Sequence, residues 1–252
     1  RARDSLFTSS VTTISLPANT TSYVNSGLQP NTKYWYRVRA RSGADYSEYS
    51  NRVKTITPLS IVYVNFNYAV PSSPAPWNNF EALPTFVETY PELKDQAGNN
   101  SGIAMTIEAI FNGEFNAGKQ TGNNSGVVPD NVLAANYWLD NTQLSQIRVS
   151  GLNHSKRYRF GFFGSSGPNG WFKGNYTATY TINDRTVYLN SWENTSKIVY
   201  IGDVVPDANG EVMLNFSTTQ TASYGFNGGV LIETYDDAQG GTVLNRAFIT
   251  ND

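Results

Sequence analysis

The 252-residue chain contains no cysteine and only one histidine. Without cysteine it has no disulfide framework, no thiol nucleophile and no cysteine-based zinc site. The single histidine, His154, cannot form a His-x-x-x-His metal pair. It stands in a polar turn beside Lys156 and Arg157, where we interpret it as a solvated residue and not a catalytic base. No serine occupies a Gly-x-Ser-x-Gly motif. The sequence therefore lacks the residues of a common serine-hydrolase site and of a histidine- or cysteine-based zinc site.

Charge is also scarce. Charged residues make up 15% of the chain, the formal net charge is −2 and the isoelectric point is near 5.5. Such a chain has no overall basic field, so we expect neither a nucleic-acid partner nor an anionic membrane partner. No apolar run reaches the length of a membrane span. Asparagine, threonine, serine, glycine and tyrosine are prominent instead, which is typical of proteins that work outside the cell, and we expect a secreted or cell-surface location.

Two stretches of the chain share one pattern. Residues 26–28 and 150–152 both read Ser-Gly-Leu, and each leucine is followed six positions later by a tyrosine, Tyr34 and Tyr158. This spacing is typical of a tyrosine corner, in which the leucine fills the core, the chain crosses between two sheets, and the tyrosine hydroxyl bonds back to the crossing backbone. A period-two pattern follows each corner. The sequence therefore predicts an all-β protein of two sandwiches in series, and 39% hydrophobic residues suffice for a core in each.

Residues 1–58 form the first predicted domain. They carry Gly27-Leu28-x-Pro30, then Tyr34-x-Tyr36-x-Val38-x-Ala40, then Tyr49-Ser50-Asn51 ahead of Thr57-Pro58. This pattern resembles the second half of a fibronectin type III module. The resemblance implies a partial sandwich that serves as a spacer, with the first strands of the module upstream of Arg1. The inner face of Tyr34, Tyr36 and Val38 would then lack an opposite sheet, so we expect a protein partner to cover it: the second domain, another copy or a separate chain.

Residues 59–252 form the second predicted domain, which begins after a short proline-containing linker. We expect one short helix over 129–136 and strands over 61–67, 101–111, 145–150, 157–164, 176–182, 185–190, 196–204, 210–218 and 229–235. Residues 236–252 either add a further strand over 243–249 or form the beginning of a linker. Strands separated by short turns predict a jelly-roll β-sandwich. Residues 70–79 contain three prolines and are expected to form a rigid extended loop that presents Trp77, Asn78 and Asn79.

The candidate ligand-binding residues are aromatic and carboxamide side chains. Proteins bind sugars by stacking the C–H faces of the sugar on exposed rings while planar amides and carboxylates take the hydroxyls. Four tryptophans of the second domain stand beside asparagine or charged residues: Trp77, Trp138, Trp171 and Trp192. We predict that Trp171 and Trp192 form a sugar platform and that Trp77, Asn78, Asn79 and Trp138 also contact the ligand. The alternative is that each tryptophan packs beneath a loop.

The acidic residues do not form a recognisable catalytic pair in the sequence. A glycosidase needs two carboxylates that face one substrate, and the acids of the first half of the second domain are scattered: Glu81, Glu88, Glu92, Asp95, Glu108 and Glu114. We therefore expect no enzyme activity and no cofactor except, at most, a structural calcium ion. The oxygen-rich segments that suggest calcium are Asp203-x-x-Pro206-Asp207-x-Asn209-Gly210 and Tyr235-Asp236-Asp237. The alternative for both is an ordinary Asx turn.

The layout of residues 61–235 resembles carbohydrate-binding modules and the C-terminal β-domains of surface proteins from gliding, polysaccharide-degrading bacteria. The opening strand, the Pro-Trp-Asn-Asn stretch at 76–79 and the Phe-Phe-Gly-Ser-Ser strand end at 162–166 carry this resemblance. It implies a non-catalytic carbohydrate-binding or adhesion region of a multidomain secreted or cell-surface bacterial protein, with a polysaccharide or other glycan as partner. The alternatives are a structural or adhesive domain that binds protein and no sugar and, last, a glycan-active enzyme.

Overall fold

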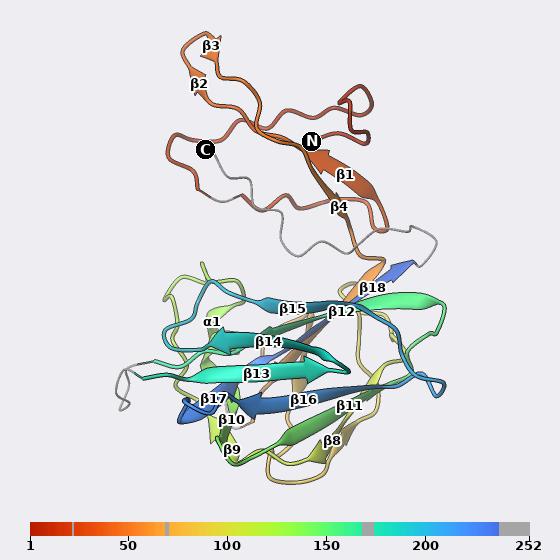
Figure 1. The fold of residues 1–252 in the computed structure, drawn as a ribbon, viewed down its shortest axis with the longest axis vertical. Coiled ribbons are helices and arrows are strands. Elements are labelled where there is room, and N and C mark those ends of the chain that lie inside the picture. The colour runs from red at the N-terminus through yellow and green to blue at the C-terminus, as the bar shows by residue number, and fades with distance from the viewer. Residues whose placement is uncertain (22, 69–70, 168–173, 237–252) are drawn as a thin grey trace. The chain divides into compact units, whose positions relative to one another are not determined.

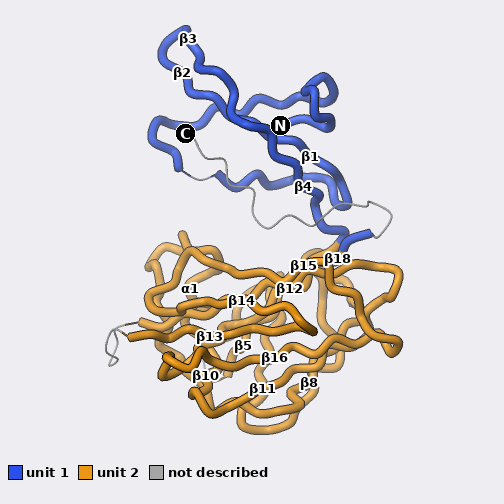
Figure 2. The backbone as a smooth tube through the Cα atoms, viewed as in Figure 1, with its two compact units in different colours: residues 1–59, 235–252 blue, residues 60–234 orange. Residues whose placement is uncertain are grey.

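The computed structural model describes residues 1–21, 23–68, 71–167 and 174–236. These residues are almost entirely β-structure with one short helix, which confirms the all-β prediction. The chain divides into a smaller unit, residues 1–59 with 235–252, and a larger unit, residues 60–234 (Figure 2). Within the described ranges, no helix is both long and apolar enough to cross a membrane.

The smaller unit is built on one long hairpin. Strand β1 (Lys33–Tyr36) pairs antiparallel with β4 (Val53–Ile56), and β2 (Arg41–Ser42) pairs with β3 (Asp45–Tyr46) (Figure 1). Backbone hydrogen bonds from Ser50 to Val38 and from Ser47 to Ala40 connect the two pairs. Ala2 exchanges two backbone hydrogen bonds of 2.9 Å with Trp35, so the beginning of the chain lies along the other edge of β1.

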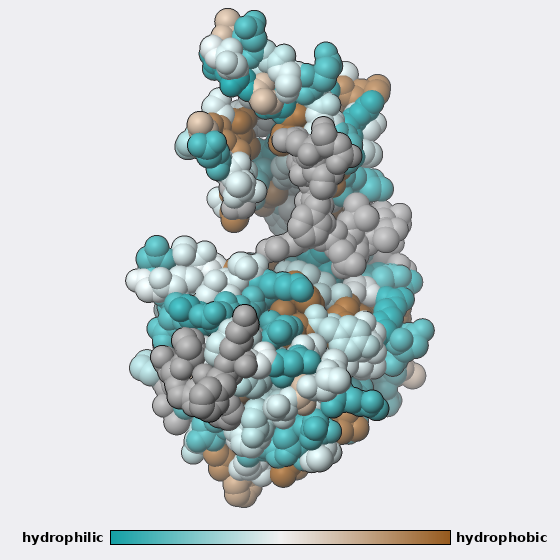
Figure 3. All heavy atoms as spheres, turned by 60° about the vertical axis from the view of Figure 1, so that its left-hand side comes forward, coloured by the Kyte–Doolittle hydropathy of each residue, from teal (hydrophilic) through white to brown (hydrophobic). Residues whose placement is uncertain are grey.

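The corner of the smaller unit is formed as predicted in one respect and not in another. The Tyr34 hydroxyl accepts a hydrogen bond from the backbone N–H of Gln29 at 3.1 Å, and the tyrosine is buried. The guanidinium of Arg3 lies over its ring, 4.5 Å from the ring centre. A protein partner for the rest of this face stays a prediction. Leu28 is only half-buried and Val38 is exposed, because the described part of this unit has no second sheet to receive them. The predicted core role of Leu28 is therefore wrong. Apolar side chains consequently reach the surface of this unit (Figure 3).

The larger unit is a β-sandwich of two main sheets. The six-stranded sheet has the order β14 (Arg185–Asn190), β13 (Thr177–Ile182), β16 (Val212–Thr218), β11 (Ser145–Ser150), β8 (Ala104–Ala109) and β7 (Thr89–Tyr90). The five-stranded sheet has the order β15 (Val199–Val204), β12 (Lys156–Phe163), β18 (Gly229–Asp236), β5 (Ser60–Phe66) and β6 (Trp77–Phe80). Aromatic residues of both sheets fill the core between them, among them Phe66, Phe162, Tyr180 and Phe216.

A third, smaller sheet closes one end of the sandwich (Figure 1). Its order is β17 (Tyr224–Asn227), β10 (Asn136–Asp140) and β9 (Gly113–Phe115). Nothing in the composition of these short segments predicted strands, because they are bounded by glycine and asparagine. Helix α1 (Asp130–Ala134) lies within the predicted helical range, and Val132 and Leu133 pack with Phe163 and Leu231 on the outer side of the five-stranded sheet.

The alternation of apolar residues predicted most of the strands correctly. In β11, Ile147 and Val149 point into the core while Gln146 and Arg148 point outward. The loop expected around Trp77 is wrong in part, because residues 77–80 form β6, which pairs parallel with β5 and buries Phe80 completely. The strand predicted over 243–249 lies outside the described residues.

The second tyrosine corner is confirmed in full. Strand β11 belongs to one main sheet and β12 to the other, so residues 151–155 cross between the sheets. Leu152 and Tyr158 are buried, and the Tyr158 hydroxyl accepts a hydrogen bond from the backbone N–H of Asn153 at 2.8 Å. Burial raises the pKa of Tyr158 above its usual value, so the hydroxyl is neutral at physiological pH. Gly151 has φ +80°, and a Cβ there would lie 1.9 Å from the Gly102 carbonyl oxygen, which explains the glycine.

We predict that Tyr158→Phe lowers the free energy of unfolding of the larger unit by about 1–2 kcal/mol, because the Asn153 N–H loses its acceptor in a buried crossing. Chemical denaturation followed by circular dichroism measures this change. Tyr188→Phe is the matched control, since Tyr188 is 56% exposed on β14. Equal stability of the two variants would contradict the corner.

Candidate functional site

The structure brings the predicted ligand-binding residues together in two places. Trp77, Asn78 and Asn79 form β6, at the edge of the five-stranded sheet. Trp138 on β10 and Trp192 after β14 belong to one aromatic cluster at the end of the sandwich. Trp171 lies outside the described residues. The two places are therefore considered as separate candidate sites.

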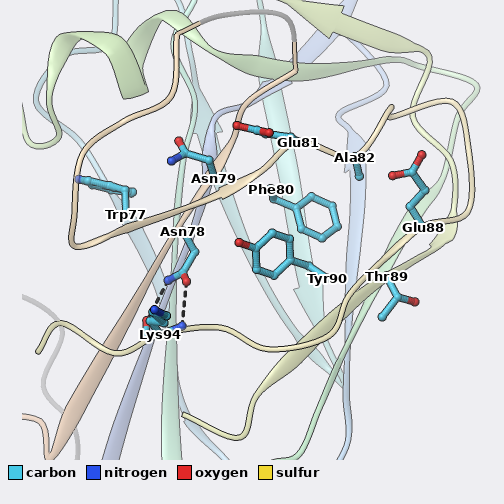
Figure 4. Close-up of a pocket in the computed structure, with 10 residues that line it drawn as sticks. All are labelled: Trp77, Asn78, Asn79, Phe80, Glu81, Ala82, Glu88, Thr89, Tyr90 and Lys94. Atoms are coloured by element: carbon cyan, nitrogen blue, oxygen red, sulfur yellow. Dashed lines mark hydrogen bonds between the residues drawn. The ribbon is translucent and has the colours of Figure 1, made fainter. Parts of the chain in front are cut away.

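The first candidate is a pocket of about 480 Å³ beside β6 (Figure 4). It lies between β6 and β7, which are the edge strands of the two main sheets. Six of the residues that line it are Trp77, Phe80, Glu81, Glu88, Tyr90 and Lys94. The pocket thus combines an aromatic floor with a charged rim.

The carboxamides of this pocket are occupied by the protein itself. The buried Asn78 amide donates hydrogen bonds to the backbone carbonyls of Tyr63 at 2.9 Å and Lys94 at 2.8 Å, and it accepts one from the Lys94 N–H at 2.8 Å (Figure 4). The Asn79 amide exchanges two hydrogen bonds of 2.8 Å with the backbone of Ser73. A sugar hydroxyl would have to displace these bonds. The structure therefore gives both asparagines a structural role, in which they hold β6 and the proline-rich segment in place, instead of the predicted ligand contact.

Trp77 also contributes mainly to packing. Its ring meets Phe163 edge-on at 5.9 Å and Tyr63 at 5.2 Å, and it is half-buried against the apolar cluster beneath α1. One side of the indole is consequently used by the protein. Trp77 is the weakest of the described tryptophan candidates for a platform.

Several of the acidic residues are likewise engaged within the protein. Glu81 accepts a hydrogen bond from the Ser72 hydroxyl at 2.7 Å, Glu92 accepts one from a backbone N–H, and Glu108 forms an ion pair of 2.6 Å with Arg148. Glu81 and Glu88 line the same pocket, but the Glu81 carboxylate turns away from Glu88 (Figure 4). This arrangement is not that of two carboxylates facing one substrate.

The second candidate is a row of four aromatic side chains, which we name the aromatic row: Trp192, Tyr176, Tyr224 and Trp138. The ring centres of Trp192 and Tyr176 are 5.6 Å apart, those of Tyr176 and Tyr224 6.5 Å, and those of Tyr224 and Trp138 5.5 Å. The first three rings are inclined to their neighbours by 34° and 22°, whereas Trp138 stands at 84° to Tyr224. Trp192, Tyr224 and Trp138 are half-buried, and Tyr176 is buried between them.

The position of Trp138 follows from its neighbour Tyr137. The Tyr137 ring is fully buried in the main core, stacked on Phe66 at 5.0 Å with an angle of 6°, and its hydroxyl donates to the carbonyl oxygens of Phe80 and Ala82. Adjacent side chains of a strand point to opposite faces. Because Tyr137 points into the core, Trp138 points out to the aromatic row, where its indole lies beside Gly113 of β9.

The aromatic row lies on a fixed base. Phe226 is buried beneath Tyr176 at 5.5 Å and contacts Phe115 at 4.4 Å. The Trp192 backbone is held by the Asn190 side chain, which accepts from its N–H at 3.0 Å, and by pairing with Ser166. The rings are thus positioned by packing beneath them before any ligand arrives.

Polar groups accompany the row. Glu193 follows Trp192 directly and forms an ion pair with Lys119 at 3.7 Å, with both side chains almost half exposed. Burial, and after it the neighbouring Tyr224, raises the pKa of Tyr176, so its hydroxyl is neutral at physiological pH. The row therefore combines apolar ring surface with one positive and one negative group at its Trp192 end.

The segments suggested for calcium form an Asx turn in one case and part of strand β18 in the other. The Asp207 carboxylate accepts hydrogen bonds from the backbone N–H groups of Asn209 and Glu211, both at 2.9 Å, which is an Asx turn. Asp203 lies 3.8 Å from Arg157. Asp236 accepts a hydrogen bond from Asn31, and Asp237 is outside the described residues. The described ranges contain no group of three or more acidic or histidine side chains that could hold a metal ion.

The sequence did not indicate two members of the row. Tyr176 and Tyr224 are 48 positions apart; Tyr176 begins the strand predicted over 176–182, and Tyr224 lies between the strands predicted over 210–218 and 229–235. A search that included tyrosines beside asparagine, as in Asn175-Tyr176, would have found one of them.

Comparisons with known proteins add two weak structural likenesses. No protein-family model matches the chain, and no curated protein matches it in sequence. The structure of the carbohydrate-binding module TmCBM61 in complex with beta-1,4-galactotriose aligns over 54% of this chain and 90% of its own, with 15% identity and a TM-score of 0.30. Bacteroides uniformis beta-glucuronidase aligns over 80% of this chain and 22% of its own, with 9% identity and a TM-score of 0.36. At these scores neither likeness identifies a ligand for this chain.

We predict that Asn79→Ala lowers the free energy of unfolding by about 1–3 kcal/mol, since its amide is the partner of two backbone groups of Ser73 and of the buried Asn65 and Asn67 amides. Thermal or chemical denaturation measures the loss. Asn100→Ala at an exposed turn is the control. A stable Asn79→Ala variant with altered ligand binding would instead restore the predicted ligand role.

Proposed function

We propose that residues 60–234 form a non-catalytic carbohydrate-binding domain that binds a polysaccharide chain along the aromatic row. The observation that carries this proposal is the line of four contacting rings with a half-buried tryptophan at each end. Half-buried indoles are suited to this task because one side packs against the protein while the rest of the ring remains accessible to the apolar faces of a sugar.

The extent of the row favours a chain over a single sugar. Its members come from four separate segments, namely β10, β17, the residue before β13 and the turn after β14. A single monosaccharide needs one ring and a few polar groups, whereas the half-buried rings of Trp192, Tyr224 and Trp138 offer more than one stacking position. The exposed ion pair of Glu193 and Lys119 supplies donors and acceptors for hydroxyl groups at one end.

Preorganisation supports the proposal as well. Phe226 and Phe115 fix the rings from below, and the Trp192 backbone is held by Asn190 and Ser166. Rings that are already in place lose little conformational entropy on binding, so more of the stacking energy is retained as affinity.

The wider setting is part of the same proposal. We infer that the protein is a secreted or cell-surface bacterial protein in which the smaller unit serves as a fibronectin type III-like spacer or adhesive segment. The low charge and the abundance of asparagine and threonine support this setting. The absence of a paired-carboxylate arrangement in the described pocket supports a binding role over a catalytic one.

We predict that Trp192→Ala and Trp138→Ala each weaken binding to a responsive polysaccharide roughly tenfold, because each removes one stacking surface worth about 1–1.5 kcal/mol. Affinity electrophoresis of the full chain through gels that contain neutral plant, algal and bacterial polysaccharides first identifies the responsive glycan and then compares the variants. Tyr188→Ala is the control, since it removes an exposed ring on β14 that is not a member of the row.

Three outcomes of this experiment are decisive. Loss of affinity in both tryptophan variants with retained affinity in Tyr188→Ala supports the aromatic row. Equal binding by all variants to a responsive glycan would place the sugar elsewhere. If no polysaccharide retards the wild-type chain, the ligand class is wrong, and a protein-binding adhesive function takes its place.

A second prediction tests the geometry without removing a ring. A Cβ at Gly113 would lie 2.9 Å from the Trp138 Nε1 atom, so Gly113→Ala must displace the indole. We expect weaker glycan binding with a shifted tryptophan fluorescence spectrum, since Trp138 is still present but moved. Wild-type affinity together with a shifted spectrum would show that Trp138 does not contact the ligand.

A further inference from the structure

The smaller unit carries a charge that the whole-chain total conceals. Residues 1–59 contain eight arginines and lysines against three acidic residues, whereas residues 60–234 contain nine against fourteen. The formal net charge is therefore +5 in the first segment and −5 in the second. Residues 235–252, which also belong to the smaller unit, contribute three aspartates and one arginine, so the formal net charge of the whole unit is +3. The smaller unit is therefore basic and favours an acidic partner.

Three of these arginines form a ladder with three aromatic rings. Arg37, Arg39 and Arg41 occupy alternate positions and so share one face of an extended segment. The ladder runs in the order Phe7, Arg37, Tyr49, Arg39, Tyr46 and Arg41. The guanidinium of Arg37 lies 4.1 Å from the centre of the Phe7 ring and 3.7 Å from that of Tyr49. Arg39 lies 4.7 Å from Tyr49 and 3.8 Å from Tyr46, and Arg41 lies 5.7 Å from Tyr46.

The guanidinium N–H groups of this ladder are largely unused by the protein. In the part of the chain that the structure describes, Arg37 and Arg39 have neither an acidic partner nor a side-chain hydrogen bond, and Arg41 donates only its Nε–H, to the Gly43 carbonyl at 2.8 Å. Stacking occupies the faces of a guanidinium and leaves its in-plane N–H donors accessible. These are the donors that bind a carboxylate or sulfate in a bidentate manner.

The chain holds the outer end of the ladder in a strained conformation. Phe7 has φ +60°, which is unusual for a bulky residue. The Asp4 carboxylate maintains this turn by accepting backbone hydrogen bonds from Leu6, Thr8 and Ser9, and Arg52 binds the Ser5 carbonyl at 2.7 Å. Strain of this kind persists only where surrounding contacts impose it. Here those contacts bring the Phe7 ring onto Arg37.

We propose that the ladder of Arg37, Arg39 and Arg41 binds an acidic polysaccharide, one that carries carboxylate or sulfate groups at regular intervals. The Cα atoms of alternate residues in an extended segment are about 6.6–6.8 Å apart, so the three arginines follow one another in a line along one face of the segment. A linear polymer with repeated anionic groups matches this line. This site lies in the smaller unit and is independent of the aromatic row.

The stacking argues against a nucleic acid as the occupant. Single-stranded nucleic acids bind by stacking bases on open aromatic faces. Tyr49 lies between Arg37 and Arg39, and Tyr46 lies between Arg39 and Arg41, so these rings already have cationic neighbours. A sugar polymer that carries acidic groups needs only the guanidinium edges.

The experiment is affinity electrophoresis of the full chain in gels with polygalacturonate, which carries carboxylates, with dextran sulfate, and with uncharged dextran. We expect retardation by one or both acidic polymers and none by dextran; the two acidic arms distinguish carboxylate from sulfate. Arg39→Gln should weaken this binding about tenfold, as expected for the loss of a charge-assisted bidentate contact. Arg39→Lys keeps the charge and much of the stem, so it should fold normally and show an intermediate affinity.

The matched control is Lys33→Gln, which removes one exposed positive charge from the same unit outside the ladder. Circular dichroism of each variant verifies that it is folded. The proposal is overturned if neither acidic polymer binds at low salt, if Lys33→Gln weakens binding as much as Arg39→Gln, or if duplex DNA binds as tightly as the acidic polysaccharides.

Discussion

The burial of Tyr137 in the core fixes the direction of the neighbouring Trp138, and with it the position of the proposed binding surface of the larger unit. Its ring stacks on Phe66 inside the sandwich, and its hydroxyl is bonded to the backbone of residues 80 and 82, so β10 has only one way to face. The alternation of a strand then directs Trp138 outward, and the pairing of β10 with β17 brings Tyr224 beside it. The aromatic row is therefore a consequence of core packing.

The two units offer different chemistry to a ligand. In the larger unit the candidate site is a cluster of aromatic rings, whose faces suit uncharged C–H surfaces, with the Glu193–Lys119 ion pair beside Trp192. In the smaller unit arginines lie over the exposed rings of Tyr46 and Tyr49, and their guanidinium groups add N–H donors. The same residue types, aromatic and charged, thus produce an apolar platform in one unit and a cationic edge in the other. The difference between the two surfaces is whether an arginine lies over the face of each ring.

Local patterns predicted the fold well and the site only in part. The Ser-Gly-Leu corners and the alternation in residues 145–150 and 185–190 depend on neighbours in sequence, so they could be recognised. The structural role of Asn78 could not be predicted from the sequence, because its amide bonds to the backbone of Lys94, which lies beside β6 only in the folded chain. The row joins residues 138, 176, 192 and 224, and no local pattern connects them. The arginine ladder was missed for another reason. The net charge of the whole chain is near zero because the basic smaller unit and the acidic larger unit offset each other.

The central claim is that a glycan contacts the aromatic row and not the pocket beside β6. The chain has five tryptophans, so the indole N–H signals of a ¹⁵N-labelled sample can be assigned individually and followed by nuclear magnetic resonance during titration with an oligosaccharide of the responsive glycan. The account predicts that the signals of Trp138 and Trp192 shift together with one affinity while those of Trp77 and Trp35 remain in place. Shifts at Trp77 with unchanged signals from Trp138 and Trp192 would contradict it.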